Sequence, residues 1–226
     1  MDELLALIQN AALKYKSIRK LVLFGSRARG DDNKESDYDI AVFGAVEQDQ
    51  LLFKNAVDEL PTLHKIDLVF VDEKTMNTPL YDSIQKEGKI IMSKFGQKLD
   101  NYQKALARLH DAVADSQKDI SNLTMRDGVI QRFEFTTELA WKATREYLIE
   151  QGEVDINSPK PVMQAAFRTR LIDDENGWLS ILNDRNHTSH IYDDSEADAV
   201  FKRILEKHIQ LFDALLKGLT ACSGSY

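Results

Sequence analysis

Cysteine is almost absent from the 226-residue sequence, whose one thiol is Cys222. A single cysteine cannot form an internal disulfide, and we expect a protein of the reducing cytoplasm. Long hydrophobic runs are also absent, since no apolar stretch approaches the roughly 18 residues that a membrane-spanning helix needs. The first segment, MDELLALIQN, is acidic and helical in pattern, unlike the basic start of an export signal. These features predict a cytoplasmic protein with no membrane partner.

An excess of positive charge is missing as well, because the formal net charge is −8. Residues 1–94 carry 13 Lys and Arg against 16 Asp and Glu, and the remaining residues carry 16 against 21. Nonspecific binding of nucleic acid rests on many cationic side chains that neutralise phosphates. The totals therefore argue against a general nucleic-acid binder and leave room only for a local basic groove.

The first part of the chain alternates between two kinds of pattern. Apolar residues recur at helical spacing in the segments 2–16, 49–60 and 79–88. Short apolar runs that predict strands cover 20–25, 37–44, 65–72 and 89–92. Strands that alternate with helices predict an α/β domain, a mixed sheet covered by helices, over residues 1–94.

The second part contains only helical patterns. They cover 97–120, 129–152, 162–172, 177–184 and 195–219. We expect an all-α bundle of antiparallel neighbours over residues 98–220, followed by a flexible tail at 221–226. Phe133, Phe135 and Trp141 lie on an apolar helix and are predicted to be core residues.

Three acidic residues stand at predicted strands where a charge has no structural use. In a strand, residues two apart point to the same side, so Asp37 and Asp39 project together and Tyr38 faces the other way. Asp67 lies among apolar residues of another strand. Three converging carboxylates repel one another unless a cation neutralises them, and Mg²⁺ accepts such oxygen ligands together with phosphates. Two such ions support an in-line phosphoryl displacement.

The segment GSRARG supplies a second requirement of phosphate chemistry. Gly25 has no side chain, so backbone amides can approach a phosphate, and Ser26 can donate a hydrogen bond. Arg27 and Arg29 can offset triphosphate charge, and Gly30 lets the chain leave the turn. Taken by itself, GSRARG is also typical of a flexible turn, and SDYD of a solvated strand entry. Their combination with a later strand Asp favours the metal and phosphate site.

The motifs GSRARG, SDYDI and KIDLVFV, in this order, resemble the minimal nucleotidyltransferases (MNT) of the DNA polymerase beta superfamily. The resemblance covers residues 1–94. It implies that Asp37, Asp39 and Asp67 bind Mg²⁺, that Gly25 and Ser26 cradle nucleotide phosphates, and that Asp67 helps to deprotonate the acceptor. The implied reaction transfers NMP from a nucleoside triphosphate and releases pyrophosphate, with the base and the acceptor left open.

A second polar segment, LNDRNHTSHIYDD, interrupts the helical part. Arg185 and His190 are five residues apart, which is about 140° around a regular helix, so one helix face cannot hold both. Either the chain bends here, or two copies share the site across a symmetric dimer. His190 could then act as a general base and Arg185 could stabilise a phosphate transition state. The alternative is a polar loop between helices with capping side chains.

RNHTSHIYDD resembles the Arg-x(4)-His-x-Tyr signature of HEPN domains, and FEFTTELAWKATREYL is similar to the branch called nucleotidyltransferase substrate-binding proteins. His187 departs from that pattern, which has an apolar residue there. Some HEPN domains are dimeric, metal-independent ribonucleases that use this Arg and His. In HEPN–MNT toxin–antitoxin pairs, the MNT enzyme adenylylates (AMPylates) the Tyr of the signature, which corresponds to Tyr192. The substrate-binding branch instead presents a small acceptor to its transferase.

Together these observations predict a magnesium-dependent nucleotidyltransferase joined to a HEPN-like bundle, which dimerises through the bundle. It would transfer AMP from ATP to an acceptor that its own bundle holds or contains, with Tyr192 as the first candidate. Two alternatives stay open: the bundle is a ribonuclease toxin, with RNA as a partner, or it is a binding and dimerisation module for another acceptor. Zinc is not expected, because His64, His110 and His208 lack metal-ligand spacing.

Overall fold

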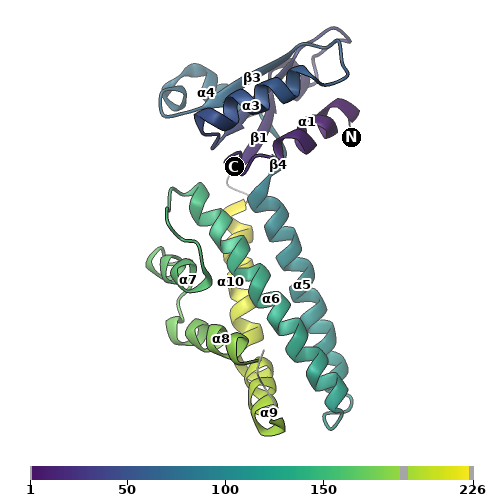
Figure 1. Ribbon diagram of the computed structural model, residues 1–226, viewed down its shortest axis with the longest axis vertical. Helices are drawn as coiled ribbons and strands as arrows, with labels where there is room; N and C mark the ends of the chain where they lie inside the picture. The colour runs from purple at the N-terminus through teal and green to yellow at the C-terminus, as the bar shows by residue number, and fades with distance from the viewer. Residues whose placement is uncertain (1, 189–192, 224–226) are drawn as a thin grey trace. The chain divides into compact units, whose positions relative to one another are not determined.

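The computed structural model describes residues 2–188 and 193–223. The chain divides into two compact units, Met1–Lys94 and Phe95–Tyr226. Figure 1 shows a sheet with helices in the first unit and helices in the second. The predicted fold class, an α/β domain followed by an all-α bundle, is thereby confirmed.

The first unit is built on a four-stranded sheet with the order β3-β2-β1-β4. Its strands are β1 (Lys20–Phe24), β2 (Tyr38–Phe43), β3 (Ile66–Val71) and β4 (Lys89–Ser93). β1 pairs antiparallel with β2 and β4, whereas β2 and β3 run parallel. A parallel neighbour requires a crossover, which helix α3 (Glu47–Asp58) provides. The sheet is therefore mixed, and residues paired between β2 and β3 share one end of the sheet.

Helices cover both faces of this sheet, because successive side chains of each strand point to opposite sides. On one face, Ile40 of β2 packs with residues of α1 (Glu3–Ala12) and α3, including Ile8 and Phe53. On the other face, Ala41 packs with Ile84 of α4 (Pro79–Glu87). A short 3₁₀ helix, η1 (Thr75–Asn77), precedes α4.

The predicted GSRARG turn forms a short helix instead. α2 (Gly25–Arg29) starts directly at the end of β1 and ends at Gly30, whose φ of 83° is left-handed. Helix α1 ends at Ala12 rather than at the predicted residue 16. Both differences follow from local backbone geometry, which apolar periodicity does not report.

In the described residues of the second unit, six α-helices pack around one apolar core. They are α5 (Lys94–Ser116), α6 (Leu123–Glu150), α7 (Pro159–Arg168), α8 (Glu175–Thr188), α9 (Asp194–Arg203) and α10 (Ile209–Ser223). Figure 1 shows α5, α6 and α10 as long rods. The buried Tyr102 hydroxyl donates a hydrogen bond to the Phe212 carbonyl at 2.7 Å, which links α5 to α10 within the core.

One core prediction for this unit was wrong. Phe135 is 50% exposed, whereas Phe133 is buried and Trp141 packs partly buried against the core. Residues two apart on a helix point about 200° apart, so Phe133 and Phe135 cannot both face the core. Residues 221–223 of the predicted tail belong to α10, which continues through Ser223, and residues 224–226 lie outside the described residues.

The predicted helix 195–219 is interrupted by a π-helical turn, Ile204–His208, between α9 and α10. This turn places His208 fully inside the unit, stacked on Phe133 with 5.4 Å between ring centroids. His208 Nε2 lies 2.7 Å from Asp184 Oδ2, and Arg203 contacts the same carboxylate with two nitrogens at 2.8 Å. The buried Asp184 and His208, together with Arg203, therefore link α8 to the π-helical turn.

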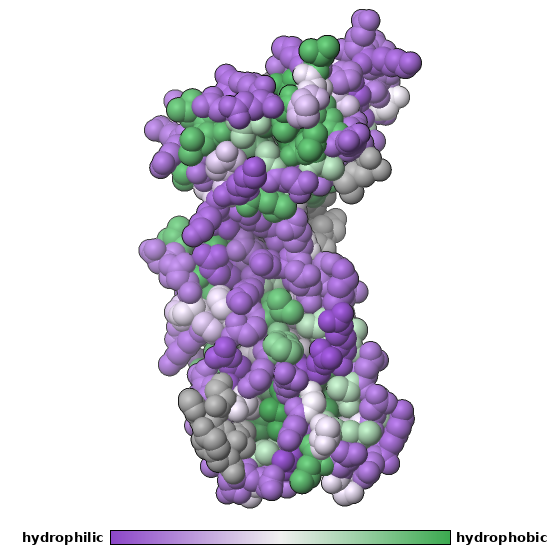
Figure 2. Space-filling model, turned by 45° about the vertical axis from the view of Figure 1, so that its right-hand side comes forward, coloured by the Kyte–Doolittle hydropathy of each residue, from purple (hydrophilic) through white to green (hydrophobic). Residues whose placement is uncertain are grey.

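None of the helices in the described ranges is long and apolar enough to span a membrane. Figure 2 shows one face of the molecule, where hydrophilic side chains prevail and hydrophobic ones form separate patches. Scattered apolar residues of this kind are ordinary on a water-exposed surface.

We expect Asp184→Asn to lower the free energy of unfolding of the helical unit by about 2–3 kcal/mol at neutral pH. Burial by itself would raise the pKa of Asp184, but hydrogen bonds from His208 and Arg203 outweigh it and hold that pKa below its usual range. A depressed carboxyl pKa stabilises the fold above the unfolded pKa of about 3.9 and ceases to do so as pH falls through the folded value.

Urea unfolding followed by circular dichroism should therefore show a constant difference from wild type between about pH 5 and 7 that shrinks below about pH 4. Asp173→Asn, an exposed position between α7 and α8, is the matched control and should leave stability unchanged. A difference that stays constant down to pH 2 would contradict this account.

Candidate active site

The three predicted carboxylates lie at one end of the two parallel strands. Asp39 of β2 is the register partner of Asp67 of β3, and Asp37 comes directly before β2. Tyr38, between the two acids, is buried on the opposite side. Burial, followed by the negative charges of Asp67 and Asp37, raises the pKa of Asp39. The carboxylates are thus near enough to repel one another.

A lysine that sequence reasoning missed lies among these acids. Lys65 Nζ is 2.5 Å from Asp67 Oδ2 and 3.4 Å from Asp37 Oδ2. The Lys65 carbonyl accepts a hydrogen bond from the Tyr38 amide at 2.9 Å, which fixes the backbone beside β2. The signal for it was present in the sequence, because Lys65 is two residues before Asp67 and therefore on the same side of the strand.

Gly25 has a steric reason to be glycine. Its φ of 72° lies in the left-handed region, and a Cβ on this residue would overlap Asp39 Oδ2 and lie 3.2 Å from Asp39 Cγ. The turn from β1 into α2 therefore passes directly over the Asp39 carboxylate. Ser26, the next residue, is half-buried in the first turn of α2. The predicted Gly-Ser element thus lies against Asp39 of the predicted acidic trio.

The two predicted arginines are engaged within the unit. Arg27 donates from Nε and a terminal nitrogen to the Ser36 carbonyl at 3.0 and 2.7 Å, and it stacks on the Tyr38 ring at 3.8 Å. Arg27 therefore lies on the Tyr38 side of β2. Arg29 pairs with Asp31 at 3.1 Å and with Glu87 at 3.2 Å, and it is exposed. A role of either arginine toward triphosphate stays a prediction.

The chemistry of the acidic trio fits a hard divalent cation. Its donors are carboxylate oxygens only, the ligands that Mg²⁺ prefers. Burial is the main cause of the raised pKa of Asp39, and a bound cation would relieve the further contribution from the charges of Asp67 and Asp37. In the part of the chain that the structure describes, no three or more His, Cys, Asp or Glu side chains are grouped as metal ligands. Lys65 pairs with Asp37 and Asp67, while Asp39 faces Gly25.

The second predicted site begins on α8. Arg185 forms an ion pair with Glu138 of α6 at 2.6 Å, and Glu138 also pairs with Lys142 at 3.1 Å. His190 and Tyr192 lie outside the described residues. The roles of Arg185, His190 and Tyr192 therefore stay predictions.

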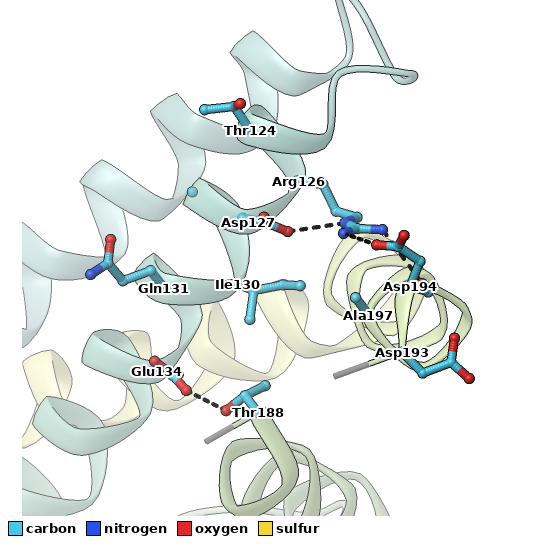
Figure 3. Close-up of a pocket in the computed structure, with 11 residues that line it drawn as sticks. Thr124, Arg126, Asp127, Ile130, Gln131, Glu134, Thr188, Asp193, Asp194 and Ala197 are labelled. Carbon is cyan, nitrogen blue, oxygen red and sulfur yellow. Dashed lines mark hydrogen bonds and ion pairs between the residues drawn. The ribbon is translucent and has the colours of Figure 1, made fainter. Parts of the chain in front are cut away.

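The described residues on either side of that segment are anchored on α6. Before it, the Thr188 hydroxyl donates a hydrogen bond to Glu134. After it, Asp194 accepts a hydrogen bond from the buried Arg126 at 2.8 Å. Figure 3 shows both contacts at a groove of about 710 Å³ that is lined by residues of α6, α8 and α9 and has Ile130 on its wall. The predicted His and Tyr thus lie, in sequence, between two fixed points on one helix.

Two family models match the chain. Residues 7–96 match the family described as "Polymerase beta, Nucleotidyltransferase", and residues 97–221 match "Nucleotidyltransferase substrate binding protein like". The chain is 35% identical over 94 residues to "Probable ribonuclease HepT" of Haemophilus influenzae, covering 40% of this chain and 64% of that protein. It is 34% identical over 91 residues to "Putative protein adenylyltransferase MJ0604" of Methanocaldococcus jannaschii, covering 34% of this chain and 83% of that protein.

Solved structures similar to this chain include a Haemophilus influenzae protein described as a substrate binding domain of a nucleotidyltransferase. It has 28% identity and a TM-score of 0.49, over 54% of this chain and 98% of that one. A chain from the complex of a tri-AMPylated Shewanella oneidensis HEPN toxin with its MNT antitoxin has 16% identity and a TM-score of 0.49, over 57% of this chain and 99% of that one.

The predicted resemblance to both families is confirmed by the family models, which together span residues 7–221. The acidic trio and Gly25 lie within the first matched range, and Arg185 lies within the second. The chain belongs to the nucleotidyltransferase substrate-binding protein-like family, and it carries this domain directly after a polymerase beta-type nucleotidyltransferase domain.

Proposed function

We propose that this protein transfers AMP from ATP to an acceptor that its helical unit supplies, with the Tyr192 hydroxyl as the first candidate. The observation that carries the proposal is the pairing of Asp39 with Asp67 beneath the side-chain-free Gly25. This arrangement joins a cation-binding edge to a backbone that phosphates can approach closely.

The reaction forms one bond and breaks one. The acceptor oxygen attacks the α-phosphorus of ATP, and the bond from that phosphorus to the oxygen bridging to the β-phosphate breaks. Pyrophosphate leaves with the electron pair. The acceptor proton passes to a carboxylate, for which Asp67 at the more exposed edge is the candidate, since its side chain is 45% exposed.

The site residues divide into ligands of the metal and contacts of the phosphates. Asp37, Asp39 and Asp67 would hold Mg²⁺, and Gly25 and Ser26 would lie against the phosphates. Bound magnesium, two ions in the reaction as predicted, supplies neutralisation of phosphate charge and in-line orientation. Asp39 is partly buried and close to the charges of Asp67 and Asp37, which together raise its pKa, and a neighbouring cation would offset both effects.

Adenylyl transfer to a protein is supported by the M. jannaschii relative, whose name describes that activity and of which the chain covers 83%. The chain covers 64% of the H. influenzae relative, so that protein's activity is not carried over as a whole. Tyr192 follows from the HEPN resemblance. An adenylylated tyrosine beside Arg185 and His190 would place bulk and negative charge there, which is a physical means of inactivating that site.

A second function, RNA cleavage by the helical unit, is favoured by one observation. Arg185 of α8 forms an ion pair with Glu138 of α6 at 2.6 Å, which orients its guanidinium. A paired and oriented arginine is suited to stabilising a phosphate transition state. Dimerisation through the bundle would let two such arginines share the site.

Intact-mass spectrometry after incubation with ATP and Mg²⁺ tests the main proposal. Wild type should gain the mass of one AMP per chain, with the label on Tyr192 in the tandem spectrum. Asp39→Asn should slow the gain by about a hundredfold or more, because the site loses a charge that holds the cation. Asp58→Asn, on the exposed side of α3, is the control and should react like wild type.

An unlabelled chain together with AMP on another added compound would reject Tyr192 while keeping the transferase. Equal labelling of wild type and Asp39→Asn would reject the assigned site.

A second test uses two glycines with the same backbone strain. Gly25→Ala and Gly30→Ala both force a side chain into the left-handed region, at φ values of 72° and 83°. Only the first would collide with Asp39, since a Cβ on Gly30 meets nothing within 4 Å. We expect Gly25→Ala to lower the rate of AMP transfer by about a hundredfold, and Gly30→Ala by no more than about threefold. Similar losses in both variants would show that strain, and not the approach to Asp39, explains Gly25.

RNA cleavage is tested with Asp37→Ala, which removes self-modification. If the second function holds, this variant cleaves RNA in gel assays without added metal, and adding His190→Ala reduces cleavage by about a hundredfold or more. Cleavage that persists after His190→Ala, or no cleavage by Asp37→Ala, counts against that function.

A further inference from the structure

Lys65 places a positive charge at the edge that the proposed function assigns to magnesium. Its ammonium forms ion pairs with Asp67 and Asp37 at 2.5 and 3.4 Å. One side chain thus pairs with two of the three acids.

The backbone of Lys65 is fixed, but its ammonium is free to leave. The Tyr38 amide holds the Lys65 carbonyl at 2.9 Å, so the residue cannot drift from the edge of β2. The side chain is 64% exposed, and the two partner carboxylates are 42% and 45% exposed. Ion pairs this exposed to water are weak, and four rotatable bonds give the ammonium many other positions.

We propose that Lys65 is a built-in counter-ion of the acidic site: it occupies the cation's place between Asp37 and Asp67, and a divalent ion must displace it. The inference rests on the proposed function, since it needs the trio to bind metal. It explains how the acids can lie side by side before a divalent ion binds.

The consequence is that nucleotide and metal binding are coupled. Without nucleotide, the ammonium repels and competes with Mg²⁺. When a triphosphate binds, its oxygens offer the ammonium new partners within reach of its anchored stem, and the carboxylates become available to the ion. By linkage, each ligand then strengthens the other. Lys65 would therefore keep the site from loading metal that arrives without nucleotide.

Calorimetric titration of Mg²⁺ into the full chain tests this, first without nucleotide and then with a non-hydrolysable ATP analogue. Lys65→Met should bind Mg²⁺ about tenfold more tightly than wild type without nucleotide, because it loses a unit charge a few ångströms from the ion. Its gain in Mg²⁺ affinity from the analogue should be smaller than that of wild type by a similar factor. Lys65→Arg keeps the charge and should behave like wild type.

Lys54→Met is the charge-matched control, because Lys54 is exposed on α3 and its loss changes the net charge equally. Thermal unfolding should be the same for all of these variants, since Lys65 is a surface residue. Mg²⁺ affinity of Lys65→Met that equals or falls below that of wild type would overturn the counter-ion role and leave the metal site standing. No Mg²⁺ uptake by any variant, with or without the analogue, would reject the metal site itself together with this inference.

Discussion

Repulsion among three carboxylates is the constraint on which the first unit depends. Asp39 and Asp67 are register partners on parallel strands, and Asp37 lies two residues before Asp39, on the same side of the strand. Such a group is unfavourable unless positive charge is near it. Lys65 brings an ammonium to this edge, and Gly25, which has no Cβ, leaves room for the Asp39 carboxylate.

The helical unit uses α6 as a common support. Glu138 pairs with Arg185, Glu134 accepts from Thr188, and the buried Arg126 holds Asp194. From the other side, His208 and Arg203 fix Asp184, the residue before Arg185. The end of α8 is therefore held from two sides by charged groups, of which Asp184 and His208 are buried.

Much of the architecture could be predicted from periodicity, since the four strands and helices α1, α3 and α4 of the first unit were expected near their observed places. Where the expectations failed, the direction of a side chain on its helix or the conformation of a single backbone position decided the outcome. Phe135 shares an apolar helix with Phe133 but faces water, because residues two apart point to nearly opposite sides. The GSRARG segment forms a helical turn because Gly30 can adopt a left-handed conformation at its end. The π-helical turn at Ile204–His208 leaves no trace in an apolar pattern.

The sequence by itself determined the alternation of elements, the shared side of Asp37 and Asp39, and the two family resemblances, because these depend on residue types at short spacing. Tertiary structure decided which strand lies beside β2, and hence that Asp67 meets Asp39 and that Lys65 reaches both Asp67 and Asp37. It also decided that His208, which sequence spacing left without a role, is buried against Asp184. Strand register and helix packing are set by contacts between distant segments, and no local pattern encodes them.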